Sequence, residues 1–401
     1  MKTLVILGGG SPYTLQLCEQ LAMSQLGGEP WQLRLQGRNS TVTAQITRYA
    51  EARLPGWKVS HATTAQSVLE GADFVIHQAR YGGLEGRHSG ESLGRALGVA
   101  ADETLGPAGL LAAIRCKPHI AELATLLHRY CPEAWVLKIT NPLSLTTSLF
   151  YLHDHPRCIG ICELPTVTQY QIATVLELPH EQLNWAYSGL NHRGFLHDIN
   201  FNGQTVLPQL LSLLSGQDLM GITATIIEEL DAVPTKYFKL LVSSKVDHND
   251  RSTQLAHLRT QILEQLHEAP LRYPSALEQR QMPWYEHAVI PILCALSGSR
   301  PACVIPINLS DKNGITREYL SSVSNDSINN DLPHHPPPHA VAKWMEIFLE
   351  HESASLSACL DPVPKKIKAA FTADPLMAHC EIKAAVSTFQ TYLTDDAYGH
   401  A

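Results

Sequence analysis

The chain has 401 residues, of which 44% are apolar, so it is long enough for two domains and apolar enough to exclude global disorder. Its 38 acidic and 30 basic residues give a formal net charge of -8, which argues against a nucleic-acid partner. Because no apolar run reaches the about 18 residues of a membrane span, and the nine cysteines lack a disulfide-like spacing, we expect a reduced, cytoplasmic protein without a membrane partner.

The first predicted elements form a nucleotide-binding unit. Residues 3–7 are an apolar strand and residues 13–23 have a helical pattern. Between them lies a glycine-rich turn made of Gly8, Gly9, Gly10 and Ser11. In a strand–turn–helix unit of this kind, backbone N–H groups and the helix N-terminus hold a pyrophosphate. The turn is therefore predicted to bind a dinucleotide cofactor.

The second predicted strand, residues 31–35, ends in a turn that bears on the choice of cofactor. An NAD-binding protein usually has an acidic residue near this point, which bonds the ribose 2′-hydroxyl. This chain has Gly37 followed by Arg38, whose guanidinium would tolerate or prefer a 2′-phosphate. Alternatively, Arg38 is a solvated loop residue that stacks on the adenine. The sequence predicts NAD, with NADP as the open alternative.

The later elements predict an α/β fold. Strands are expected at residues 74–78, 135–139 and 158–161, with helices at 109–115 and 120–130 between them. This alternation is typical of a Rossmann-like, doubly wound parallel sheet. We expect it to form a dinucleotide-binding domain over residues 1–195.

The second half, residues 196–401, is expected to be a mixed, mostly helical domain for substrate binding and oligomerisation. A strand is predicted at residues 302–308, and residues 321–339, rich in Ser, Asn, Asp and Pro, are predicted to be an exposed loop. Four helical patterns surround them, at residues 207–214, 222–230, 255–266 and 340–349.

Cys162 and His192 each end a short apolar run and are candidate metal ligands. A thiolate and an imidazole bind Mn, Fe, Co, Ni or Zn well. Two protein ligands would leave coordination positions open for a substrate that binds through vicinal hydroxyls. The alternative is a core cysteine and an ordinary loop histidine.

Other polar residues stand where strands and loops meet. Asn141 closes a predicted strand, where its amide can reach the crevice at the carboxyl end of the sheet, although Asn-Pro also forms turns. Arg80 and Arg87 flank a Gly-Gly pair and can clamp an anion or remain solvated. Glu103 is either a charge at a helix start or a contact to cofactor or sugar. Tyr285 is either a packing residue or a base whose pKa a metal lowers from about 10.

Taken together, these segments resemble glycoside hydrolase family 4, and within it the 6-phospho-β-glucosidases. The resemblance covers roughly residues 1–200 and continues more weakly to about residue 380. It rests on Val-Ile-Leu-Gly-Gly-Gly-Ser-Pro-Tyr-Thr, Arg80-Tyr-Gly-Gly-Leu-Glu-Gly-Arg87, Glu103-Thr-Leu-Gly-Pro-Ala-Gly, Thr140-Asn-Pro, Cys162-Glu-Leu-Pro and Gly189-Leu-Asn-His192, in this order.

The resemblance implies a glycosidase that uses NAD and one divalent metal, most fittingly Mn²⁺, in place of the usual pair of carboxylates. Hydride leaves C3 of the sugar, a base removes the C2 proton, the aglycone leaves C1, water adds, and the hydride returns. The residue roles that the resemblance implies are metal binding for Cys162 and His192, C2 deprotonation for Tyr285, and contacts to the sugar or cofactor for Arg87, Asn141, Glu163 and Asn191. It also implies a homodimer or homotetramer.

Departures from the family pattern leave alternatives open. The residue after the metal cysteine is commonly Asn or Asp in this family, whereas this chain has Glu163, which suits a sugar hydroxyl better than a phosphate. The substrate is therefore expected to be a 6-phosphoglycoside, with a non-phosphorylated glycoside as an alternative. A net NAD(P)-dependent dehydrogenase of sugars or hydroxy acids with the same fold is another alternative, and a non-catalytic sensor is a third.

Overall fold

The computed structural model of the chain describes residues 1–26, 29–242, 250–333 and 335–394. Parallel strands form the N-terminal part of its main sheet: β1 (Lys2–Leu7), β2 (Trp31–Gln36), β3 (Lys58–Ala62), β4 (Phe74–His77), β5 (Trp135–Lys138) and β6 (Cys158–Gly160). They lie in the order β3-β2-β1-β4-β5-β6. This order, with its reversal between β1 and β4, is that of dinucleotide-binding sheets. The predicted doubly wound parallel sheet is confirmed.

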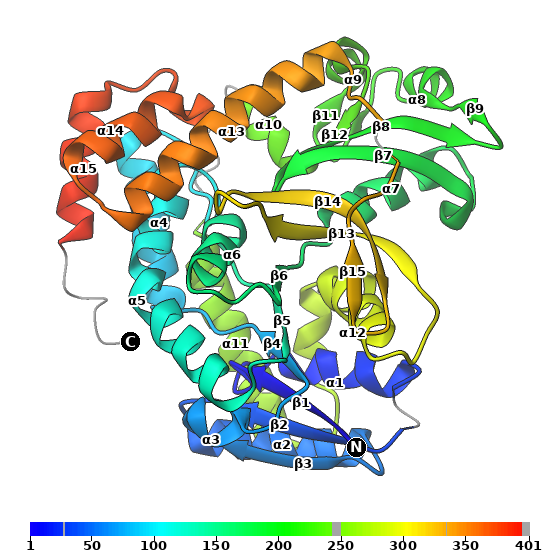
Figure 1. Cartoon of the computed structure of the whole chain (residues 1–401), viewed down its shortest axis with the longest axis vertical. Coiled ribbons are helices and arrows are strands. Elements are labelled where there is room, and N and C mark those ends of the chain that lie inside the picture. The colour runs from blue at the N-terminus through cyan, green and yellow to red at the C-terminus, as the bar shows by residue number, and fades with distance from the viewer. Residues whose placement is uncertain (27–28, 243–249, 334, 395–401) are drawn as a thin grey trace.

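The same sheet continues beyond β6 through antiparallel strands. These are β7 (Leu183–Leu190), β8 (Arg193–Phe201), β9 (Gln204–Thr205), β12 (Val233–Pro234), β13 (Cys303–Ser310), β14 (Thr316–Ser324) and β15 (Ser327–Asn329). From β6 the order runs β13-β14-β7-β8-β12, with β15 beside β14 and β9 beside β8. A separate pair consists of β10 (Asp218–Leu219) and β11 (Ile222–Thr223). Figure 1 shows β13 and β14 between the parallel strands and the green β7–β8 hairpin.

Helices cover both faces of the parallel strands. Leu4 and Ile6 of β1 belong to one apolar cluster and Val5 and Leu7 to another, because successive side chains of a strand point to opposite faces. The first cluster includes residues from α1 (Thr14–Met23), α2 (Ser40–Arg53), α11 (Arg251–Glu268) and α12 (Ile290–Leu296). The second includes residues from α3 (Gln66–Leu69), α4 (Gly83–Leu97), α5 (Gly106–Tyr130), α6 (Leu143–Leu152), α14 (Pro364–Ala373) and α15 (Ile382–Leu393).

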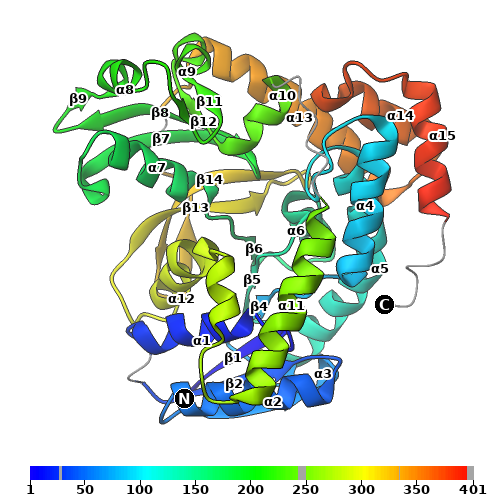
Figure 2. The ribbon, with the colours of Figure 1, turned by 180° about the vertical axis from the view of Figure 1, so that it is seen from behind.

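A third apolar cluster lies under the β7–β8 hairpin. It contains residues from α7 (Leu164–Val175), α8 (Leu207–Leu213), α9 (Ala224–Leu230) and α13 (His339–Leu360). The short helix α10 (Lys239–Val242) lies nearby, and Figure 2 shows α11 running beside α4. Within the described ranges, no helix combines the length and the apolar character needed to cross a membrane.

Several expectations about the second half need correction. The predicted boundary at residue 195 falls inside β8, and β13 pairs with β6, so both halves of the chain build one sheet. The predicted loop at 321–339 is wrong over its first part, where β14 continues to Ser324 and β15 follows. Ser321 and Val323 are fully buried there, because this strand face packs on the core. His334 of that loop lies outside the described residues.

A buried polar network joins α13 to the start of β8. Arg193 Nη2 lies 2.8 Å from Glu352 Oε2, and Arg193 Nη1 lies 2.6 Å from His351 Nδ1. Ser144 of α6 donates a further hydrogen bond to Glu352. Both partners of the ion pair are almost completely buried. The network therefore fixes the residue that directly follows His192.

Replacing Glu352 should strongly destabilise the protein. The Glu352→Ala variant leaves Arg193 as a buried charge without its carboxylate, which typically costs about 3–5 kcal/mol. Urea unfolding followed by circular dichroism measures the loss. Glu350 lies exposed on the same helix, and Glu350→Ala should change the stability by less than about 0.5 kcal/mol. Equal effects of the two variants would contradict the role of the network.

Candidate active site

Several predicted cofactor and metal residues, together with Gln78, follow the carboxyl ends of four neighbouring strands. The glycine turn follows β1, Gln78 follows β4, Asn141 lies three residues after β5, and Cys162 lies two residues after β6. Because β1, β4, β5 and β6 are parallel and adjacent, these segments lie along one edge of the sheet. Ligands of doubly wound sheets bind at this edge, next to the point where the strand order reverses.

The glycine turn is shaped by a close backbone approach. Gly8 has a φ of 85°, and a Cβ there would lie 2.8 Å from the backbone nitrogen of Ala79. Glycine is therefore required at this position. Ser11 N donates to Gly8 O at 3.0 Å and closes the turn ahead of α1. The predicted strand, turn and helix are all present.

His192 lies in the two-residue turn that joins β7 to β8. Its φ of 64° is left-handed, which is uncommon for a residue other than glycine. Burial, reinforced by Lys236, lowers the pKa of His192 to about 3, so its imidazole is neutral at physiological pH. Within the described part of the chain, His192 Nδ1 and both amide atoms of Asn191 are buried without a hydrogen-bond partner. Such unsatisfied atoms are available for a ligand.

Tyr237 contacts the surroundings of both predicted metal ligands, His192 and Cys162. Its ring stacks on that of His192, with 4.2 Å between centroids and an interplanar angle of 11°. It also packs against the small cluster that Cys162 forms with Leu143 and Leu164. Tyr237 lies in a short helical turn, Lys236–Phe238, which follows the two-residue strand β12 and has no glycine motif beside it. The sequence analysis missed it because its role follows only from tertiary contacts.

Cys162 and His192 fit a divalent metal chemically. Burial raises the pKa of the Cys162 thiol well above its usual value, and Glu163 and Glu318 raise it further. A bound cation would reverse this effect, because a coordinated thiol is deprotonated. Together with the neutral imidazole it would offer the sulfur and nitrogen ligands that borderline metals prefer.

Another group of potential metal ligands lies between α4 and α11. Ligand atoms of His88, Glu91 and Asp250 lie within 4.8 Å of one another. The two carboxylates already accept hydrogen bonds, because Ser252 Oγ donates to Glu91 at 2.7 Å and Thr253 Oγ1 donates to Asp250 at 2.7 Å. Asp250 also caps α11, because its Oδ1 accepts a hydrogen bond from Thr253 N at 3.1 Å. We assign these carboxylates a structural role.

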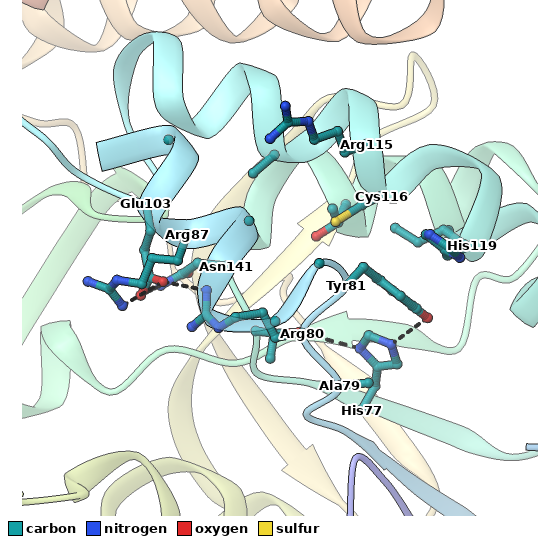
Figure 3. A pocket seen from close by; sticks show the side chains of 18 of the residues that line it. His77, Ala79, Arg80, Tyr81, Arg87, Glu103, Arg115, Cys116, His119 and Asn141 are labelled. Carbon is teal, nitrogen blue, oxygen red and sulfur yellow. Dashed lines mark hydrogen bonds and ion pairs between the residues drawn. The ribbon is translucent and has the colours of Figure 1, made fainter. Parts of the chain in front are cut away.

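Glu103 forms ion pairs with Arg80 and Arg87, the two predicted anion-binding arginines, in a pocket beneath α4 and α5 (Figure 3). Its Oε2 lies 2.5 Å from Arg80 Nη1 and 2.8 Å from Arg87 Nη1, and Asn141 Nδ2 donates to its Oε1 at 3.4 Å. Burial alone would raise the pKa of Glu103, but Arg80 and Arg87 hold it well below its usual range. Arg87 also pairs with Glu91 at 2.7 Å. The structure thus brings Arg87 and Asn141 together, with Arg87 bound to two carboxylates.

Tyr285, the predicted base, lies in the apolar cluster on the α1 face of the sheet. Its hydroxyl donates to Gln78 Oε1 at 2.7 Å, while Gln78 Nε2 donates to Thr14 Oγ1 and to Gly8 O. Burial raises the pKa of Tyr285 above its usual value. These contacts give Tyr285 a supporting role behind the glycine turn.

The two remaining predicted residues lie at opposite ends of this edge. Arg38 is exposed in the turn after β2. Glu163 follows Cys162 at the start of α7 and is half-buried. Burial raises the pKa of Glu163, which Lys236 and Arg280 only partly oppose. Glu163 is thus close to Cys162, as the sequence requires, whereas Arg38 lies with the cofactor elements.

Comparisons with known proteins relate the chain to a family of hydrolases. Residues 3–178 match the family described as Family 4 glycosyl hydrolase. A probable 6-phospho-beta-glucosidase of Bacillus subtilis (strain 168) is 22% identical over 355 residues, which cover 81% of this chain and 78% of that protein. The 6-phospho-beta-glucosidase of Escherichia coli (strain K12) is 26% identical over 331 residues, covering 74% and 73%.

A solved structure shares the whole fold. The 6-phospho-beta glucosidase of Thermotoga maritima, solved with manganese, NAD+ and glucose-6-phosphate, superposes with a TM-score of 0.84. The superposition covers 98% of each chain at 19% sequence identity. The antiparallel extension of the sheet is therefore part of a known architecture.

Proposed function

We propose that this chain, whose residues 3–178 match glycosyl hydrolase family 4, cleaves a 6-phosphoglycoside by transient oxidation of the sugar. The observation that carries the proposal is the position of Tyr237, which contacts the ring of His192 and the cluster around Cys162. A phenol beside two metal-ligating side chains suits the removal of a proton from carbon. The named activity of the relatives in Bacillus subtilis and Escherichia coli supports the same substrate class.

The residues divide into three groups in this proposal. Cys162 and His192 would hold the divalent metal, most fittingly Mn²⁺. The glycine turn (residues 8–11), Arg38 and Asn141 would hold the dinucleotide. When bound, the dinucleotide supplies reversible hydride abstraction at C3 and the metal polarises the sugar oxygens at C2 and C3.

Tyr237 is proposed as the base that removes the C2 proton, in place of Tyr285. Burial holds the pKa of Tyr237 well above its usual value, and Asp102 and Glu103 add to this effect. A cation beside His192 would act in the opposite direction, because nearby positive charge favours the phenolate. Asn191, whose amide atoms have no partner among the described residues, is proposed to bond a sugar hydroxyl together with Arg87 and Glu163.

Solvent deuterium distinguishes this mechanism from its alternatives. In D₂O we expect the released sugar to carry deuterium at C2, because the C2 proton exchanges before water adds back. No NADH should accumulate, since the hydride returns to C3. Cleavage without deuterium at C2 would contradict the mechanism, and steady NADH formation would favour a net dehydrogenase.

A non-phosphorylated glycoside is the second candidate substrate. Two observations favour it: Arg87 is already paired with Glu91 and Glu103, and the half-buried carboxyl of Glu163 lies next to Cys162. A dianionic phosphate near these carboxylates would be repelled unless a cation intervened. Faster cleavage of the plain glucoside than of its 6-phosphate would select this candidate.

The cellular location and the oligomeric state of the protein stay predictions. A cytoplasmic location and a homodimer or homotetramer are expected from the composition and from the family resemblance. Light scattering coupled to size-exclusion chromatography would determine the number of subunits.

A further inference from the structure

The turn after β2 has no room for the acidic side chain that NAD-binding proteins use. A Cβ on Gly37 would lie 2.3 Å from Thr43 Oγ1 and 2.8 Å from the backbone nitrogen of Gly10. Both distances are far shorter than a carbon contact allows. Gly37 is therefore held as glycine by its packing against the glycine turn, and a carboxylate at this position is sterically excluded.

The side chain of the preceding residue, Gln36, forms hydrogen bonds within the protein. Its Oε1 accepts a hydrogen bond from Gly8 N at 3.1 Å, and its Nε2 donates to Thr63 O at 3.0 Å. The side chain thus ties the glycine turn to the loop after β3. Neither of the two residues at the end of β2 supplies the carboxylate that usually bonds the ribose 2′-hydroxyl.

Arg38 is the single charged residue on the two loops that border this end of the site. Residues 37–41 read Gly-Arg-Asn-Ser-Thr and residues 63–67 read Thr-Thr-Ala-Gln-Ser. Arg38 is exposed and makes no ion pair or hydrogen bond with any residue in the described ranges. The next residue, Asn39, is fixed by capping α2, since its Oδ1 accepts from Val42 N at 3.1 Å. A cation without an acidic neighbour stands where the ribose is expected.

We propose that this dinucleotide site recognises the 2′-phosphate of NADP through Arg38 and prefers NADP to NAD. The inference rests on the proposed function, which places a nicotinamide dinucleotide along this edge of the sheet. A guanidinium binds a phosphate through two parallel charge-assisted hydrogen bonds. NAD would gain no such bonds and would find no carboxylate for its 2′-hydroxyl.

Calorimetric titration of the full-length protein tests the inference without relying on turnover. We expect adenosine 2′,5′-bisphosphate to bind at least about tenfold more tightly than 5′-AMP, and NADP more tightly than NAD by a similar factor. Added salt should reduce the difference, because an exposed charge pair is screened. Arg38→Ala should abolish the preference for the ligands that carry a 2′-phosphate, while Arg38→Lys should retain part of it.

Arg48→Ala is the matched control, because Arg48 is an exposed arginine of helix α2, which begins two residues after Arg38. It should keep the full preference for NADP. Equal or tighter binding of NAD by the parent protein would overturn this inference alone, and a preference that survives Arg38→Ala would overturn the role of Arg38. Binding of neither dinucleotide would overturn the proposed function as well.

Discussion

The Cys162→Ser variant should lose bound metal and glycosidase activity together while it keeps its fold. A serine hydroxyl does not replace a thiolate as a ligand for a borderline metal. Because metal polarisation is worth several kcal/mol in a transition state, the rate should fall by about 10³-fold or more. Metal analysis of the purified protein, initial rates and the thermal midpoint measure the three properties separately.

Cys380→Ser provides the control for this variant. Cys380 is a partly buried free cysteine whose Sγ contacts Leu97 O, away from the carboxyl ends of the parallel strands. Its replacement should leave metal content and rate unchanged. Normal metal content and a normal rate in Cys162→Ser would refute the assignment of Cys162 as a ligand.

The Tyr237→Phe variant should lose about 10²- to 10⁴-fold in kcat, the usual contribution of a positioned general base. Removing only the hydroxyl keeps the ring that stacks on His192, so metal and dinucleotide binding should persist. Deuterium exchange at C2 should slow in parallel with cleavage. Rates, metal content and exchange by nuclear magnetic resonance together separate the loss of a base from the loss of a site.

Tyr285→Phe is the matched comparison, because it removes another buried phenolic hydroxyl. It breaks the hydrogen bond to Gln78, so we expect a loss of about 1 kcal/mol in stability and a change in kcat of only a few fold. The reverse pattern, with an inactive Tyr285→Phe and an active Tyr237→Phe, would restore Tyr285 as the base.

The sequence alone located the residues that follow strand ends. The glycine turn, Asn141 and Cys162 could be placed because continuous apolar runs predict buried parallel strands, and such strands share one carboxyl edge. His192 was identified in the same way, at the end of the run that forms β7. The doubly wound parallel arrangement also followed from the alternation of strands and helices.

Other features depend on contacts between distant segments, and no local pattern predicts these. Tyr237 became a candidate only through its stacking on His192, and the hydrogen bond from Tyr285 to Gln78 is visible only in the folded chain. β3 escaped prediction because its sequence, Lys-Val-Ser-His-Ala, is polar and largely exposed. The pairing of β13 with β6, which joins the two halves of the chain in one sheet, links segments more than a hundred residues apart and had no local signal.

The most direct measurement is the hydrolysis of p-nitrophenyl β-glucoside 6-phosphate, assayed with and without dinucleotide and Mn²⁺ under reducing conditions. The plain p-nitrophenyl β-glucoside is assayed in parallel, and NAD and NADP are each supplied. We predict cleavage that requires both the dinucleotide and the metal and that produces no net NADH or NADPH. Cleavage of either glycoside that proceeds unchanged after removal of both additives would contradict the proposed oxidative mechanism.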